Sequence, residues 1–186
     1  RMPTLISGST GVNKIQDGTI VNADIASGAA IAGTKLVMPT GSVLQVVEAT
    51  NATYIAFADD WNWDLVVSRT ITLSSTSSRV LIMVHFGGCS VADGTTGNYP
   101  ALKGRVLRGS TEIGMEEGYM LYHNASEIHR MGNFDLQGID SPGTTSELTY
   151  NVEAGNNGGS SKSGVYSGSI NRSGGKTKII LVEIGG

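Results

Sequence analysis

The sequence predicts an all-β protein with a narrow N-terminal segment that associates with copies of itself, followed by an antiparallel β-body. Glycine supplies 26 of the 186 residues, about twice its usual share, which favours turn-rich β structure over helix. From Ser42 to the C-terminus, short β-type runs alternate with turn clusters. Before Ser42, apolar residues recur at a spacing that neither a helix nor a strand explains.

The N-terminal apolar residues are spaced by five, five, six and five positions: Ile15, Ile20, Ile25, Ile31 and Leu36. Five helical steps of about 100° leave neighbours about 140° apart, and an odd spacing in a strand places them on opposite faces. The pattern is typical of a chain that turns between apolar contacts. Such a chain is too narrow to bury its own isoleucines, so we expect copies of the chain to wrap about a common axis with these residues at the interface.

A domain boundary is expected near residue 40, because Met38-Pro39-Thr40-Gly41 is a turn signal. We therefore expect a trimerising stalk over 1–40 and a β-body over 41–186. Two further segments, Ile55–Trp61 and Glu116–His129, leave room for a helix but are broken by Gly or Asn. Many short strands at this spacing indicate a sandwich or a barrel. The expected strands are Val43–Ala49, Leu65–Leu73, Arg79–Phe86, Leu102–Leu107, Glu112–Glu116, Ile128–Leu136, Glu147–Glu153, Gly164–Ile170 and Lys176–Ile184.

Two expected strands, Val80–Phe86 and Ile179–Ile184, are apolar on both faces. One face of a sandwich strand fills the core, so the other face must meet something else. We expect a subunit interface there, formed in part by Leu81, Met83 and His85. His85 has two interpretations, a satisfied interface or core histidine and a metal ligand on a three-fold axis.

Composition excludes several classes of function. The net charge is −3 with no basic cluster, which argues against nucleic-acid binding. No apolar run approaches the roughly 20 residues that span a bilayer, so no membrane insertion is expected.

Cys89 is the only cysteine, and it is interpreted as a small buried hydrophobe or, alternatively, as part of an axial thiol cluster. The chain begins at Arg1, and we expect it to be a fragment of something longer.

Catalytic chemistry is not expected. The acid pairs Asp59-Asp60 and Glu116-Glu117 are adjacent in sequence, which does not supply the cleft-spanning separation that a glycosidase needs. No nucleophile elbow, phosphate loop or dinucleotide fingerprint is present. We therefore expect a non-enzyme without cofactor or metal.

Aromatic and amide residues in and beside the turn clusters form the candidate receptor-binding set. Trp61 and Trp63 share a face on an extended segment, which suits stacking against a sugar, although either residue also suits anchoring a loop on the core. Tyr combined with Asn, Ser and Gly is typical of adaptable recognition surfaces, although solvated loops without a ligand have the same composition. The candidates are Trp61, Trp63, Asn98, Tyr99, Tyr119, Tyr122, Asn156, Asn157 and Tyr166.

The stretch Asp17–Leu36, DGTIVNADIASGAAIAGTKL, resembles a segment of bacteriophage tail-fibre and virion structural proteins, notably of marine phages. The body resembles the knob that often follows this segment in such proteins. The matching pieces, in order, are Gly41–Val47, Thr70–Val84, Arg108–Ser110, Gly138–Val152, Ser169–Gly174 and Leu181–Gly186. The resemblance implies a homotrimer with an intertwined stalk and a jelly-roll-like β-sandwich knob, similar to tumour-necrosis-factor-type heads. It transfers no catalytic or binding residue by position.

The leading hypothesis is a homotrimeric phage fibre or spike protein in the virion. Its partners would be itself, other virion proteins through the N-terminal side, and a host surface glycan or protein through the knob. The second hypothesis is a virion structural protein without a receptor, such as a head fibre, capsid decoration or collar component. The third is an enzyme such as a polysaccharide depolymerase, although those chains are usually longer and have acidic clefts.

Overall fold

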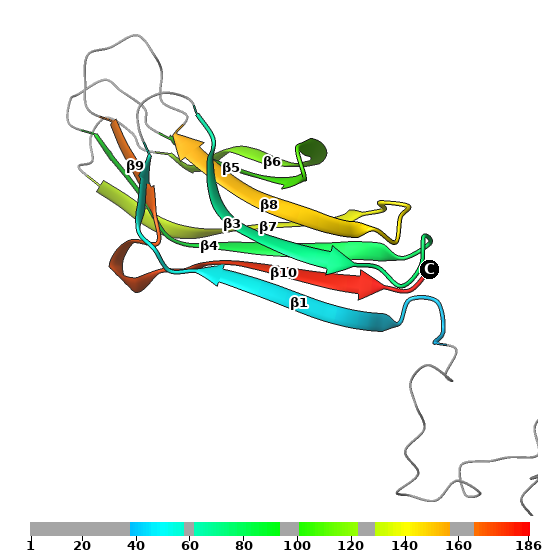
Figure 1. The fold of residues 1–186 in the computed structure, drawn as a ribbon. Coiled ribbons are helices and arrows are strands. Elements are labelled where there is room, and N and C mark those ends of the chain that lie inside the picture. Colours follow the sequence, from blue (N-terminus) through cyan, green and yellow to red (C-terminus); the bar gives the residue numbers. More distant parts are fainter. Residues whose placement is uncertain (1–37, 58–61, 94–100, 123–128, 157–165) are drawn as a thin grey trace, which may run out of the picture. The chain divides into compact units, whose positions relative to one another are not determined.

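Ten strands form the described part of the folded body (Figure 1). The computed structural model describes residues 38–57, 62–93, 101–122, 129–156 and 166–186. The chain separates into two compact units, Arg1–Val37 and Met38–Gly186, and the second is described here. The strands are β1 Val43–Asn51, β2 Ile55–Phe57, β3 Asp64–Thr72, β4 Arg79–Asp93, β5 Ala101–Arg108, β6 Thr111–Tyr122, β7 His129–Asp140, β8 Glu147–Asn156, β9 Tyr166–Ile170 and β10 Thr177–Ile184.

The strands form two antiparallel sheets that pack as a sandwich. The larger sheet has the order β1-β10-β4-β9-β2, with β7 also paired to β4, and the smaller sheet has the order β3-β8-β5-β6. When the short strands β2 and β9 are set aside, the first strand pairs with the last, the second with the second-last, and so on inward: β1 with β10, β3 with β8, β4 with β7 and β5 with β6. This nested pairing is the arrangement of a jelly roll, so the body is an all-β sandwich of that kind.

The expected strands are confirmed in position, and most of their ends differ by a few residues, whereas β4 and β6 extend well beyond their expected ends. The alternation in Thr70-Ile71-Thr72-Leu73 is also confirmed, because Ile71 and Leu73 are buried while both threonines are exposed. Neither segment that left room for a helix holds one in its described part. Ile55–Phe57 pairs with β9 instead, and β6 continues to Tyr122 because its backbone pairs with β5.

Strand β4 is longer than expected, because Gly87-Gly88 forms a bulge rather than a strand end. The register to β7 shifts between Phe86 and Cys89, and pairing then resumes as far as Ala92. Gly88 has a φ of 61°, which an L-residue with a side chain adopts only with strain. The bulge therefore bends the strand where the sequence pattern resembles a turn.

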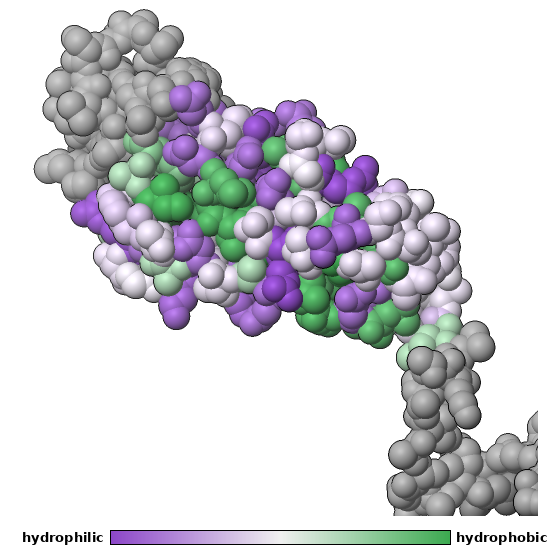
Figure 2. Space-filling view, viewed as in Figure 1, coloured by the Kyte–Doolittle hydropathy of each residue, from purple (hydrophilic) through white to green (hydrophobic). Residues whose placement is uncertain are grey.

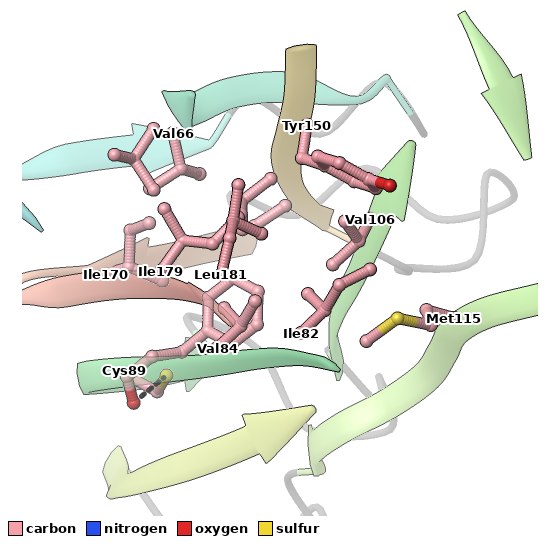
Figure 3. Packing of buried hydrophobic residues seen from close by; sticks show 14 of the residues in the cluster. Val66, Ile82, Val84, Cys89, Val106, Met115, Tyr150, Ile170, Ile179 and Leu181 are labelled. Atoms are coloured by element: carbon pink, nitrogen blue, oxygen red, sulfur yellow. Dashed lines mark hydrogen bonds between the residues drawn. The ribbon is translucent and has the colours of Figure 1, made fainter. Parts of the chain in front are cut away.

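The core lies between the sheets and is built from alternate residues of each strand. Figure 3 shows Ile82 and Leu181 of the larger sheet packing toward Val106 and Tyr150 of the smaller sheet. All four side chains are at most 1% exposed. Cys89 is also buried here and donates a weak hydrogen bond to the Phe86 carbonyl oxygen at 3.5 Å, which confirms its interpretation as a buried apolar residue.

The two ends of the sandwich differ in what they carry. The Gly41 amide donates to the Gly185 carbonyl oxygen at 2.7 Å, so the start of the body and the C-terminus share one end, as Figure 1 shows. The strand ends at Asp93, Tyr122 and Asn156 lie at the opposite end. No helix in the described part of the chain is long and apolar enough to cross a membrane.

Candidate functional site

The outward face of the larger sheet brings together the three predicted interface residues of the body. Along β4, Val80, Ile82, Val84 and Phe86 point into the core and are at most 2% exposed. Leu81, Met83 and His85 alternate with them and therefore lie on the opposite face. Leu81 and Met83 are half-buried and His85 is exposed.

An apolar strip crosses four strands on this face. Val182 of β10 and Ile139 of β7 flank Leu81, and Val46 of β1 lies beyond Val182. Ile180 of β10 lies beside Met83 in the next row. Val46 is 58% exposed and Ile139 57%, so the two edges of the strip meet solvent in the isolated chain. We call Val46, Leu81, Met83, Ile139, Ile180 and Val182 the outer-face strip.

Charged groups border the outer-face strip on one side. Lys178 Nζ lies 2.8 Å from Glu48 Oε2, and His85 Nδ1 lies 2.7 Å from Asp135 Oδ1. Register places Lys178 directly beside His85 in the same row. A hollow of about 190 Å³ opens between this row and the strip and is lined partly by Met83 and Ile180. The face therefore combines a continuous apolar area with a polar margin, the usual layout of a protein interface.

The apolar surface at Val46 extends along β1 toward the start of the body. Figure 2 shows hydrophobic surface over the first half of β1, whose Val43 and Val46 are each 58% exposed. Val43 pairs with Ile184 of β10, so this area continues the outer-face strip toward the end where residue 38 begins the body. Contiguous exposed apolar surface of this kind is typical of contact sites.

The predicted receptor-binding residues divide between described and undescribed parts of the chain. Trp61, Asn98, Tyr99 and Asn157 lie outside the described residues, as do the predicted stalk residues Ile15, Ile20, Ile25, Ile31 and Leu36. Tyr119 and Tyr122 lie in β6, and Tyr166 begins β9. Register puts Tyr122 opposite Ala101 and Tyr166 opposite Asp93, so both residues lie at the end of the sandwich away from Gly41.

Two of these candidates, Trp63 and Asn156, do not lie on an open binding surface. Trp63 packs beside β5, with its ring centroid 4.2 Å from Lys103 Nζ and 4.3 Å from Arg105 Cζ. Asn62, the residue before it, lies so close to Gly155 that a β-carbon there would collide with the Asn62 carbonyl oxygen. Trp63 therefore anchors its segment on the smaller sheet, the alternative that the sequence left open.

Asn156 differs more strongly from a surface residue, because only 1% of it is exposed. It ends β8 opposite the buried Leu102. Its side-chain amide has no hydrogen-bond partner in the described part of the chain. Asn156 is thus an inward-facing residue at the end of the sandwich that carries the other candidates.

Sequence reasoning missed a buried carboxylate in β10, although Glu183 alternates with Ile179 and Leu181. Glu183 lies in an apolar run and is 1% exposed. Its Oε1 accepts from the Ser74 amide at 2.8 Å and the Ser74 hydroxyl at 2.6 Å, and its Oε2 accepts from Gln45 Nε2 at 2.6 Å. Burial raises the pKa of Glu183, but these donors outweigh burial and hold its pKa below the ordinary value of 4.5. Glu183 therefore ties β1 and the β3–β4 connection to β10.

A second polar group joins the two sheets. Arg108 Nη1 of β5 lies 2.7 Å from both carboxylate oxygens of Asp140 in β7. The fully buried Tyr150 of β8 donates its hydroxyl to Asp140 Oδ2 at 2.7 Å. Burial, together with the Asp140 carboxylate, raises the pKa of Tyr150 well above its ordinary range. Both polar groups are structural and occupy the end of the sandwich that holds the C-terminus.

Comparisons with known proteins find only distant structural likenesses. A scan against models of protein families and a search of curated proteins gave no match. Solved structures that resemble the chain include infectious bursal disease virus, Gx strain, with a TM-score of 0.43 and 11% identity over 85% of this chain. The VP2 subviral particle of the same virus gives a TM-score of 0.43 and 10% identity, also over 85%. The chain spans only 36% and 37% of those two chains. At these values the likeness carries no inference about function.

Proposed function

We propose that the chain is a homotrimeric virion fibre protein whose knob contacts the host surface. The observation that carries this proposal is the outer-face strip, because a jelly-roll sandwich needs only one apolar face per sheet. The larger sheet here has two such faces. The resemblance of Asp17–Leu36 and of the body pieces to phage fibre proteins supplies the trimer and the virion setting.

In this proposal Leu81, Met83 and His85 form part of the contact between knobs. Burial of the outer-face strip would contribute about 25 cal/mol for each Å² of apolar surface removed from water. The stalk residues Ile15 to Leu36 would form the second part of the trimer contact. Paired substitution of Ile20 and Ile25 by Asp should then loosen the stalk, since unpaired carboxylates are costly to bury.

Receptor contact is proposed for the end of the sandwich opposite Gly41. Support comes from the arrangement of the two ends of the body. Residue 38 and the C-terminus are at one end, and the strand ends that flank the candidate aromatic residues are at the other. Other virion proteins would attach through the N-terminal side. Three weak sites on one trimer would give avidity without strong single-site affinity.

We propose a binding protein rather than an enzyme, and a virion protein without a receptor remains the alternative. The test uses the purified full chain, added to susceptible cells before the phage. Slower adsorption of the phage, with saturable binding of the protein to cells, is expected for a receptor-binding knob. A trimer that neither binds cells nor slows adsorption would favour the head-fibre, decoration or collar role.

A further inference from the structure

The turn between β9 and β10 is held by buried polar contacts rather than by apolar packing. Asn171 and Thr177, which bracket this turn, are 3% and 0% exposed. The Asn171 amide donates to the Gly87 carbonyl oxygen at 2.9 Å, and its Nδ2 donates to the Thr53 carbonyl oxygen at 2.8 Å. Its Oδ1 accepts from the Thr177 hydroxyl at 2.8 Å. These contacts fix the backbone of Arg172–Gly174, a single turn of 3-10 helix.

The same turn lies directly on the β4 bulge with no side chain between the two backbones. A β-carbon at Gly175 would lie 2.5 Å from the Gly88 nitrogen, and one at Gly88 would collide with the Arg172 carbonyl oxygen. The Gly88 amide donates to Asn133 Oδ1 of β7 at 3.0 Å, which orients that side-chain amide. The turn, the bulge and β7 therefore form one preorganised unit.

A hollow of about 350 Å³ lies where these three elements meet. Its lining residues are three glycines together with Met131, Asn133, Arg172 and Ser173. Met131 is 54% exposed and supplies an apolar side of the hollow. The volume falls within the range of small-molecule sites, about 300–1,000 Å³, and is enough for one sugar ring.

Arg172 is a cation without a carboxylate partner in the described part of the chain. The one hydrogen bond from its guanidinium among those residues reaches the buried Ser90 hydroxyl at a long 3.4 Å. By contrast, Arg105 and Arg108 each pair with a carboxylate at 2.7 Å. Arg172 is an exposed residue on a rigid turn, and a guanidinium is a natural partner for an anion because its planar donors match a carboxylate.

We propose that this hollow binds the acidic sugar unit of a surface polysaccharide, with the sugar carboxylate on Arg172. The Asn133 amide and the Ser173 hydroxyl would bond ring hydroxyls, and the apolar face of the ring would pack on Met131. This inference rests on the proposed host-surface role and gives it a ligand class and a site that none of the sequence candidates includes.

The test measures sugar binding to the full chain by saturation-transfer NMR, with methyl β-D-glucuronide as the probe. Methyl β-D-glucoside differs only in carrying a hydroxymethyl group in place of the carboxylate, and it should bind up to about fivefold more weakly, the factor that an exposed charge pair supplies. Arg172→Gln should reduce glucuronide binding by a similar factor, and Arg172→Lys by less. Arg69→Gln, an exposed arginine on the other sheet, is the matched control and should change nothing.

Equal binding of the two sugars, or unchanged glucuronide binding in Arg172→Gln, would overturn the proposal. Met131→Ala gives a second readout that does not involve charge, and it should weaken the binding of both sugars by a similar factor. Adsorption of the protein to cells is measured in parallel. If glucuronide does not bind the wild type and Arg172→Gln still adsorbs to cells, the acidic-sugar site is refuted. The proposed host-surface function is then retained.

Discussion

Removing the Glu183 carboxylate should destabilise the body substantially, because three hydrogen bonds converge on it. Bonds to a charged group are worth about 1.5–3 kcal/mol each. Ser74 is exposed and can return its donors to water, whereas Gln45 is half-buried. Glu183→Ala should therefore cost about 3 kcal/mol, close to the high end for the one bond, from Gln45, whose donor stays half-buried. At about 2–4 °C for each kcal/mol, the midpoint of thermal unfolding should fall by about 6–12 °C.

Glu183→Gln is the finer variant, because it keeps the shape and removes the charge. The amide oxygen can still accept from Ser74, but the new NH₂ group faces the Gln45 donor, so we expect a loss of about 2 kcal/mol. The assay is urea unfolding at one fixed protein concentration, since association shifts apparent stability. Glu48→Gln removes an exposed ion pair with Lys178 and should change stability by less than about 1 kcal/mol, which makes it the matched control.

The direction of the Glu183 pKa shift predicts how the stability of the body changes with pH. The pKa of Glu183 is lower in the folded than in the unfolded chain, so its stabilisation is present above the ordinary pKa of 4.5. That stabilisation is lost as the pH falls through the lowered folded-state pKa. The difference in the free energy of unfolding between the wild type and Glu183→Gln should therefore shrink as the pH falls from 7 to 3. A difference that stays constant, or a Glu183→Ala variant as stable as the wild type, would refute the reasoning.

Three further predictions concern other buried groups. Tyr150→Phe removes one bond to the Asp140 carboxylate and should cost about 2 kcal/mol in urea unfolding; a neutral result would mean that water replaces the hydroxyl. Gly88→Ala combines a left-handed backbone with a backbone collision and should cost more than about 2 kcal/mol, whereas Gly143→Ala, with a similar φ in open space, should cost about 1 kcal/mol. Burial, with a smaller effect of a nearby carboxylate, raises the pKa of Cys89 to about 12, so iodoacetamide should alkylate the native thiol more than about 1,000-fold more slowly than the unfolded one. Equal alkylation rates would contradict this.

The strands could be predicted because local pattern decides them. Turn clusters such as Ser74–Ser78 and Arg108–Thr111 separate runs of β-branched and aliphatic residues, and alternation identifies the core face in Thr70–Leu73. The sequence predicts that β4 ends at Phe86, because Gly87-Gly88 has the composition of a turn. Only its contacts with the turn before β10 make it a bulge within a continuous strand.

The pairing order and the polar sites could not be predicted, because both depend on contacts between distant residues. Glu183 reads as a solvent-facing interruption of an apolar run, but its partner Ser74 is 109 residues away. Alternation with Ile179 and Leu181 was the one local signal that it faces the core. Arg172 likewise lies in a segment that indicates only a turn, and its surroundings come from β4 and β7.

The mass of the assembled protein tests the central claim most directly, and light scattering after gel filtration measures it. The full chain should give three times the 19.4 kDa mass of one chain. Ile139→Asp places a charge in the outer-face strip, so it should weaken the contact between knobs and lower the measured mass. Leu65→Asp, equally exposed at 57% on the other sheet, should leave the trimer intact. A monomeric wild type would contradict the account, and an Ile139→Asp protein that assembles like Leu65→Asp would remove the outer-face strip from the interface.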